Sequence, residues 1–275
     1  MSTTTTQPDG TGTPGQDTAQ ELLFEVKGHV AHLTLNRPKA LNSISHDLDL
    51  RLQQAWQEIN DNPDIWVAVL SASGDRAFCA GADVGGGPEA HASRLALGGG
   101  LTGIGGPLLK LKKPLIAAVH GYALGGGFEL AMCADIIVAA DTAQFGLPET
   151  KAGIIGECGV VHRAIRQLPH RIAMAMILTG ERLGAQDALQ YGLVNEVTSR
   201  EELEAAAAAW AEKICAASPL AVQAAKHAAL ERAGYPLEVA LATRFEPIEA
   251  YANSADSKEG PKAFAEKRKP VWSGR

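Results

Sequence analysis

Cysteine is scarce in this sequence and shows no paired spacing. The four cysteines among 275 residues form no CxxC pair and have apolar or small neighbours. We therefore expect reduced packing residues rather than a disulfide framework. They are Cys79, Cys133, Cys158 and Cys215. The eight histidines show neither HxxxH nor HExxH spacing, so the sequence predicts no metal site.

Long apolar runs and excess positive charge are also missing. No apolar stretch reaches the roughly 18 residues of a membrane span, and the N-terminus has no basic segment followed by an apolar one, as a signal peptide would. Lys and Arg number 25 against 31 Asp and Glu, a net charge of −6, and no basic block is interleaved with aromatic residues. We expect a cytoplasmic protein with no membrane and no nucleic-acid partner.

Hydrophobic residues make up 46% of the chain, enough for a substantial core in one or two domains. Residues 1–17 are rich in Thr, Gly, Pro and Gln and are expected to form a disordered leader. From residue 22, β-branched segments alternate with helical patterns, which predicts an α/β domain. The expected elements are a hairpin of strands 22–26 and 30–35, a helix over 45–60, strands at 66–70, 115–119 and 135–139, and a short helix over 128–133.

Beyond residue 159 the pattern becomes helical and rich in alanine. We expect helices near 159–168, 170–179, 184–191, 200–216, 219–233 and 236–252, with a single strand at 193–197. The final segment, residues 260–275, is basic and punctuated by proline, yet Phe264 and Trp272 would be costly to leave exposed. We expect it to dock on another surface.

The most informative segment is the run Gly125-Gly126-Gly127-Phe128-Glu129, with a second glutamate at Glu149. Glycines at a helix start expose N–H groups that suit an anionic oxygen. Gly126 and Glu129 are three residues apart and share one face if both lie on the first helical turn. An oxyanion donor and a proton-transfer group would then meet, as enolate chemistry requires. Glycine triplets are more often plain turns, so the triplet alone is weak evidence.

A second loop of small residues, Phe78–Asp83, follows the strand at 66–70. Its small side chains let a ligand approach the backbone, and the Ala82 N–H is a candidate second donor for the same oxyanion.

Together these segments resemble the crotonase, or enoyl-CoA hydratase/isomerase, superfamily. The resemblance runs in unbroken order over about residues 20–275, with matches at 36–42, 78–83, 120–130, 145–149, 178–180, 185–194 and 263–268. It implies an α/β crotonase fold in which stacked ββα units form a spiral core over residues 18–200. A helical region over 201–275 would then serve oligomerisation and complete the CoA site.

The resemblance also implies roles for individual residues. Ala82 and Gly126 would form an oxyanion hole for the thioester oxygen, and Glu129 and Glu149 would lie on either side of a water. The residues expected to contact CoA are Lys39, Ala40, Leu41, Ala80, Asp83, Val84 and Gly125, with Phe264 and Lys267 reaching a neighbouring subunit's site. The implied activity is hydration of an acyl-CoA substrate by a homotrimer or a dimer of trimers. No separate cofactor is needed, because CoA is part of the substrate.

One departure from the hydratase pattern is Glu157, eight residues beyond Glu149, where many hydratases have glycine. Dienoyl-CoA isomerases of the superfamily carry an aspartate there and carnitinyl-CoA dehydratases an acid, and residues 259–275 resemble the dehydratases. The chain is therefore expected to be an enoyl-CoA hydratase, or else an isomerase or dehydratase that uses Glu149 and Glu157. Glu157 could equally cap the helix expected from 159. A non-catalytic binding protein on the same fold is disfavoured by the intact Glu129 and Glu149 pair.

Overall fold

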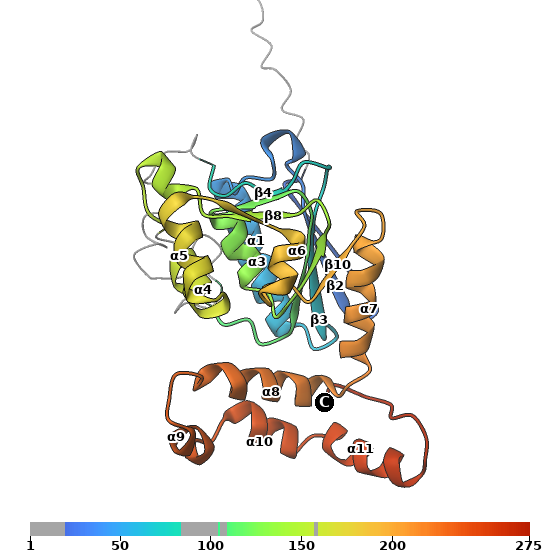
Figure 1. Ribbon diagram of the computed structural model, residues 1–275. Helices are drawn as coiled ribbons and strands as arrows, with labels where there is room; N and C mark the ends of the chain where they lie inside the picture. The colour runs from blue at the N-terminus through green and yellow to red at the C-terminus, as the bar shows by residue number, and fades with distance from the viewer. Residues whose placement is uncertain (1–19, 84–103, 105–108, 157–158) are drawn as a thin grey trace, which may run out of the picture.

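The computed structural model describes residues 20–83, 104, 109–156 and 159–275. The expected leader, the glycine-rich segment after Asp83, and the predicted site residues Val84 and Glu157 lie outside the described residues, as does Cys158. Within the described part the chain forms two sheets, with a layer of helices below them in Figure 1.

The larger sheet has six strands in the order β1-β2-β3-β5-β7-β10 among the described residues. The β1–β2 hairpin is antiparallel, with Leu22 opposite Leu35, and every later pairing in this sheet is parallel. Its strands are β1 (Leu22–Lys27), β2 (Val30–Leu35), β3 (Val67–Ala72), β5 (Leu115–Val119), β7 (Ile136–Ala140) and β10 (Glu196–Thr198).

The smaller sheet has four described strands in the order β4-β6-β8-β9. Strands β4, β6 and β8 run parallel, and each follows soon after a strand of the larger sheet, so the chain repeats a two-strand unit three times. The expected stacking of α/β units is confirmed, although these three-residue strands were not predicted. Their bounds are β4 (Ala77–Cys79), β6 (Tyr122–Leu124), β8 (Gln144–Gly146) and β9 (Arg182–Gly184).

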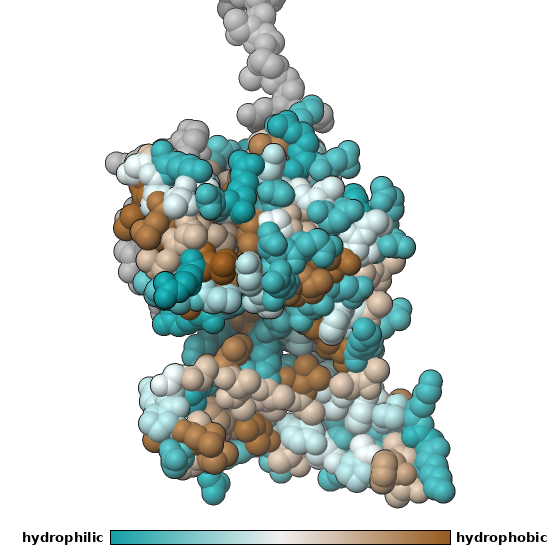
Figure 2. Space-filling view, in the orientation of Figure 1, coloured by the Kyte–Doolittle hydropathy of each residue, from teal (hydrophilic) through white to brown (hydrophobic). Residues whose placement is uncertain are grey.

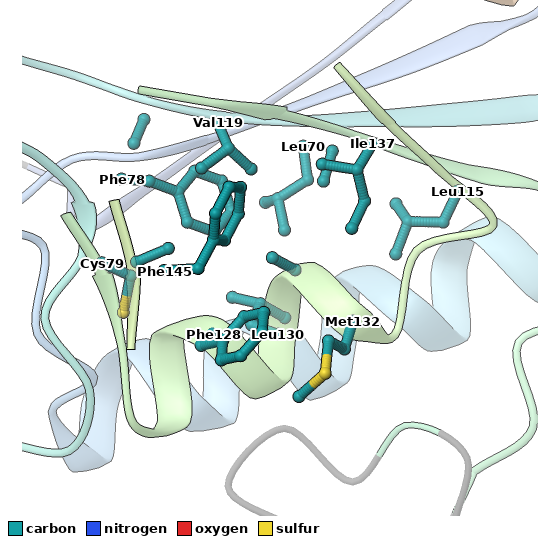
Figure 3. Packing of buried hydrophobic residues seen from close by; sticks show 14 of the residues in the cluster. Leu70, Phe78, Cys79, Leu115, Val119, Phe128, Leu130, Met132, Ile137 and Phe145 are labelled. Atoms are coloured by element: carbon teal, nitrogen blue, oxygen red, sulfur yellow. The ribbon is translucent and has the colours of Figure 1, made fainter. Parts of the chain in front are cut away.

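The main core lies between the two sheets and helices α1 and α3 (Figure 3). Helix α1 (His46–Asp61) begins where the Ser45 side chain accepts a hydrogen bond from Leu48 N, as the sequence predicts. In α3 (Gly126–Met132), Phe128 packs beside Phe145 of β8 with ring centroids 5.5 Å apart. This packing fixes the start of α3 against the smaller sheet.

Helix α7 (Leu203–Cys215) covers the outer face of the larger sheet. Leu203, Ala207 and Ala211 pack there against alternate residues of β3, β5 and β7. Both faces of these strands are therefore buried, which explains why they are continuous apolar runs rather than alternating ones.

Three further helices lie beside the core: α4 (Val160–Gln167), α5 (His170–Thr179) and α6 (Ala185–Gln190). Two 3₁₀ turns, η1 (Pro38–Ala40) and η4 (Glu149–Ala152), carry or adjoin predicted site residues. The strand expected over 193–197 begins only at Glu196, because Leu193 N bonds Ala188 O and so continues the turn that ends α6.

The last four helices form the separate layer below the core in Figure 1. They are α8 (Pro219–Glu231), α9 (Leu237–Ala242), α10 (Glu246–Ala252) and α11 (Asp256–Ala265). The helix expected over 236–252 is thus wrong as one unit. It breaks after Ala242, and Pro247 stands in the first turn of α10, where proline starts a helix more readily than it continues one.

Helix α8 is tied to the core by charge, since Lys226 Nζ lies 2.6 Å from Asp135 Oδ2 and also donates to Lys113 O at 2.9 Å. In the final segment, Trp272 Nε1 donates to Ala216 O, so this side chain docks as expected. Phe264 instead remains 88% exposed. No helix within the described residues is long and apolar enough to cross a membrane.

Candidate active site

The turn before α3 requires glycine at two positions for different reasons. Gly125 has φ +53°, and a Cβ there would stand 3.1 Å from Glu149 Oε1. A Cβ on Gly127 would stand 2.1 Å from Cys79 O, so the start of α3 presses directly on β4. The triplet is therefore a close contact between backbones rather than a free surface turn.

The two predicted oxyanion donors lie on neighbouring backbones. Gly126 is the first residue of α3, where an N–H has no partner inside the helix. A Cβ on Gly81 would be 3.3 Å from Gly126 N, so the loop bearing Ala82 passes beside it. Gly81 O and Asp83 N are both bonded to Ile44, and among the described residues neither the Ala82 nor the Gly126 N–H forms a hydrogen bond.

Glu129 lies one turn into α3 and is only 3% exposed. Its two carboxyl oxygens are buried and have no hydrogen-bond partner within the described structure. Burial raises the pKa of Glu129 to about 8, nearby Arg163 acts to lower it, and Glu149 adds to the rise. At pH 7 such a carboxyl is mostly protonated.

Glu149 opens η4, and burial raises the pKa of this carboxyl as well. It borders a small apolar hollow lined by Leu147, Ile155, Val161 and Ile177, among others. A Cβ on Gly156 would be 3.2 Å from Glu149 Oε1, and one on Gly159 would be 3.2 Å from Glu129 Oε1. The two carboxyls therefore face the same stretch of chain, whose Glu157 lies outside the described residues.

Most of the residues predicted to contact CoA lie in or next to the loop Phe78–Asp83. This loop bears the candidate donor Ala82 and is called the donor loop below. Lys39 and Ala40 are exposed on η1, and Leu41, with φ +53°, accepts a hydrogen bond from Ala80 N at 3.0 Å. Asp83, three residues after Ala80, pairs with Arg37 at 3.0 Å. The structure thus joins the segment that carries Lys39, Ala40 and Leu41 to the loop that carries Ala80 and Asp83.

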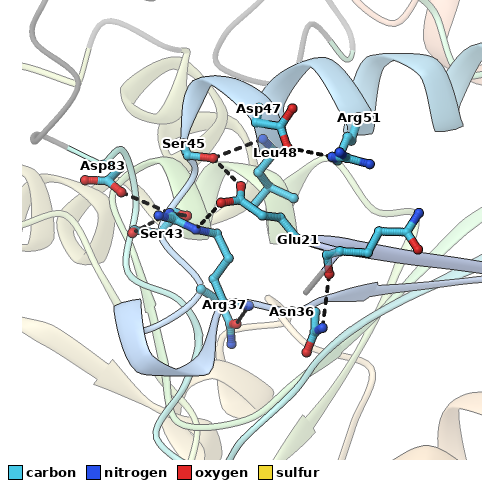
Figure 4. A network of polar contacts seen from close by, with 11 residues as sticks. Glu21, Asn36, Arg37, Ser43, Ser45, Asp47, Leu48, Arg51 and Asp83 are labelled. Atoms are coloured by element: carbon cyan, nitrogen blue, oxygen red, sulfur yellow. Dashed lines mark hydrogen bonds and ion pairs between the residues drawn. The ribbon is translucent and has the colours of Figure 1, made fainter. Parts of the chain in front are cut away.

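Two residues outside the predicted site set hold this loop in place, and Figure 4 shows the contacts of one of them, Arg37. Arg37 pairs through Nε with Glu21 at 2.9 Å, and through Nη1 donates to Ser43 O at 2.6 Å and to Asp83 Oδ2 at 3.0 Å. Asn42 is 1% exposed, and its Nδ2 donates to Ala77 O at 2.8 Å. Both lie within the 36–42 match, which was the only available signal.

Phe264 and Lys267 are not brought to this cluster within one chain. They lie at the end of α11 in the lower layer of Figure 1, apart from the core that carries α3. No group of three or more potential metal ligands occurs among the residues that the structure describes.

The fold and site thus define a protein in which the backbones of the Ala82 loop and Gly126 lie side by side, near a buried Glu129 carboxyl and a half-buried Glu149 carboxyl whose pKa values are both raised. This arrangement is suited to enolate-forming acid–base chemistry. The family model for enoyl-CoA hydratase/isomerase matches residues 25–275. The chain belongs to this family, within the crotonase superfamily.

Individual relatives agree with this assignment. The chain is 40% identical over 254 residues to (E)-benzylidenesuccinyl-CoA hydratase of Thauera aromatica, covering 91% of this chain and 98% of that protein. It is 41% identical over 262 residues to carnitinyl-CoA dehydratase of Escherichia coli K12, covering 94% of this chain and 100% of that protein.

A solved structure from Novosphingobium aromaticivorans, which carries the name short chain enoyl-CoA hydratase, is 62% identical with a TM-score of 0.85, covering 94% of this chain and 100% of that one. The crotonase fold is therefore confirmed, and these hydratase and dehydratase relatives support an enzyme of the hydro-lyase class.

Proposed function

We propose that the protein is an enoyl-CoA hydratase that adds water reversibly, in the syn sense, to a 2-enoyl-CoA thioester. One observation carries the proposal: the start of α3 presents the Gly126 N–H and, one turn later, the buried Glu129 carboxyl beside Glu149. In the proposed site, the Gly126 N–H serves as an oxyanion donor and the two carboxyls serve as the proton-transfer groups.

In this mechanism the thioester oxygen accepts hydrogen bonds from the Ala82 and Gly126 N–H groups. Negative charge develops on that oxygen as the enolate forms, and each donor is worth roughly 3–4 kcal/mol in a dry site. Glu129 takes one proton from water while the water oxygen bonds to Cβ, and Glu149 gives a proton to Cα. The pair regains its original state when one proton passes between the carboxyls, and dehydration reverses each step.

The test follows loss of the ultraviolet absorbance of the conjugated thioester when crotonyl-CoA is hydrated. We expect Glu129→Gln and Glu149→Gln each to lower kcat on the order of 10²–10⁴-fold, because each removes one proton-transfer group. The exposed Glu201→Gln serves as the matched control and should retain full activity. Full hydratase activity in Glu129→Gln would overturn the assignment.

The pH profile separates the roles of the two carboxyls. If Glu129 is the base, kcat/KM rises between pH 7 and pH 9, since the group ionises with a pKa of about 8. A fall over the same range would instead make Glu129 the acid.

A second candidate is a specialised dehydratase or an isomerase that uses Glu149 and Glu157. It is favoured by the relatives named carnitinyl-CoA dehydratase and by Glu157 itself. Assays with crotonyl-CoA, carnitinyl-CoA, benzylidenesuccinyl-CoA and a dienoyl-CoA distinguish the candidates. Loss of carnitinyl-CoA or dienoyl-CoA turnover in Glu157→Gln, with crotonyl-CoA hydration intact, would favour the second.

For substrate binding we propose that CoA contacts Lys39, Ala40, Leu41, Ala80, Asp83, Val84 and Gly125. The enzyme then needs no separate cofactor, because CoA is part of the substrate. Phe264 and Lys267 would complete the CoA site of a neighbouring subunit in a homotrimer or a dimer of trimers. The 88% exposure of Phe264 on the outlying α11 supports this part of the proposal, since so large an apolar side chain gains by being covered.

A further inference from the structure

Arg163 is a cation at the candidate site that the mechanism above does not use. It lies in the first turns of α4, and its Nε is 3.7 Å from Glu129 Oε1. The distance is short enough for strong attraction and too long for a hydrogen bond. Neither this Nε nor either Glu129 oxygen has a hydrogen-bond partner in the described part of the chain, although all three atoms are buried.

The position of Arg163 is held from two sides. Its Nη2 donates to Ile104 O at 2.7 Å, which anchors the far end of the guanidinium. Helix α4 is itself tied to α3, because Gln167 Nε2 donates to Met132 O at 3.0 Å. Gly159 allows this approach, since it caps α4 with φ +99° and a Cβ there would stand 3.2 Å from Glu129 Oε1.

Among the described residues, two charged groups act on the Glu129 carboxyl, and they act in opposite directions. Arg163 faces it from α4 and lowers its pKa, whereas Glu149 faces it from η4 and raises it. The thiol of Cys133, one turn further along α3, has a pKa raised by burial to about 12 and stays uncharged near neutral pH. Arg163 is therefore the group that opposes the effect of burial.

We propose that Arg163 is a positioning residue, which makes the buried Glu129 able to ionise and holds its carboxylate toward α4. The inference rests on the proposed function, in which Glu129 takes a proton from water. A lysine could supply the charge there, but not the second nitrogen that Arg163 uses to bond Ile104 O.

The first test is the pH dependence of crotonyl-CoA hydration in Arg163→Gln and Arg163→Lys. We expect the rising limb of kcat/KM to move up by about one pH unit in Arg163→Gln and by less in Arg163→Lys. At a pH above the displaced limb, kcat should return toward the wild-type value, and KM should change little. Arg166→Gln is the matched control, because Arg166 is exposed on the same helix and bonds only His162 O among the described residues.

A purely structural role predicts a different result. Arg163→Gln would then lose activity equally at every pH, with the limb unmoved, and the proposal would be overturned. A double-mutant cycle supplies a further readout from denaturant unfolding. At pH 9, where Glu129 is ionised, the destabilisation caused by Arg163→Gln should shrink when Glu129 is already Gln, whereas an unchanged destabilisation assigns Arg163 to the Ile104 contact alone.

The proposal can also be checked without turnover. In a protein carrying ¹³C-labelled glutamate, the carboxyl signal missing from Glu129→Gln identifies Glu129, and its titration is followed in wild type, Arg163→Gln and Arg163→Lys. An upward move of the titration midpoint in Arg163→Gln supports the inference even if the protein hydrates no enoyl-CoA. Absence of hydration would overturn only the proposed function. An unmoved midpoint overturns the inference even if hydration is rapid.

Discussion

At the residue scale, burial of Glu129 links folding to pH. The unfolded chain has the ordinary glutamate pKa of 4.5 and the folded chain about 8, so between these values the folded state binds more protons. The free energy of unfolding should therefore fall as pH rises from about 4.5 to 8, by an amount of the order of a few kcal/mol.

Denaturant unfolding at pH 5, 6.5 and 8 measures this slope. In Glu129→Gln the slope should be much shallower, because the amide cannot ionise. The free energy of unfolding of this variant should therefore rise relative to that of the wild type as the pH approaches 8. Exposed Glu201→Gln gives the background. Identical slopes in wild type and Glu129→Gln would show that Glu129 is not the responsible group.

Gly127 gives a second prediction at this scale. Its Cβ position is 2.1 Å from Cys79 O, a backbone atom that cannot rotate away, whereas a Cβ on Gly184 would come no closer than 3.8 Å to Gln144 Nε2. Gly127→Ala should therefore destabilise the protein by about 2–3 kcal/mol or more and displace Gly126, lowering kcat. Gly184→Ala should cost clearly less, about 1 kcal/mol at most, because it meets no close atom and loses only the preference for glycine at the N-cap of α6. Thermal unfolding and hydratase assays compare them, and equal stabilities would contradict the close contact.

At the scale of elements, Arg37 joins the start of β1 to the donor loop through Glu21 and Asp83. Arg37→Gln removes the guanidinium that pairs with two half-buried carboxylates, so we expect a loss of about 1–3 kcal/mol in stability. A raised KM should accompany it as the loop loosens around Asp83. Arg51→Gln removes only an exposed pair with Asp47 in the same network and should alter neither quantity measurably. Urea unfolding and steady-state kinetics measure both, and an unchanged KM in Arg37→Gln would separate the network from the site.

Elements with strong local signals could be predicted. Ser45 and the apolar stripe behind it predict the helix found at His46–Asp61, and the hairpin around Gly28 is confirmed. Strands β4, β6, β8 and β9 escaped prediction because three residues are too few to show a period. Their order depends on pairing between segments far apart in the chain. The role of Arg163 likewise gave no local signal, because its partner Glu129 lies on another helix.

At the scale of the whole molecule, the layer formed by α8–α11 stands apart from the core and bears apolar surface (Figure 2). Leu237 and Leu241 on α9 are 68% and 77% exposed. If this layer packs against neighbouring subunits, Leu241→Glu should shift the protein toward monomers in light scattering after size exclusion. Lys258→Glu on α11, another exposed position, is the control. A monomeric wild-type protein would contradict the proposed trimer.

The sequence by itself determined the family, the α/β class and the residue types at the site, because caps, apolar periods and spaced motifs are local properties. It also named Gly126, Ala82, Glu129 and Glu149, whose catalytic roles remain predictions. Only the tertiary structure decided that Glu129 is sealed from solvent and faces Arg163, and that one chain leaves Phe264 away from the site. Burial and charge–charge distance arise from contacts between segments remote in sequence, so no local pattern could specify them.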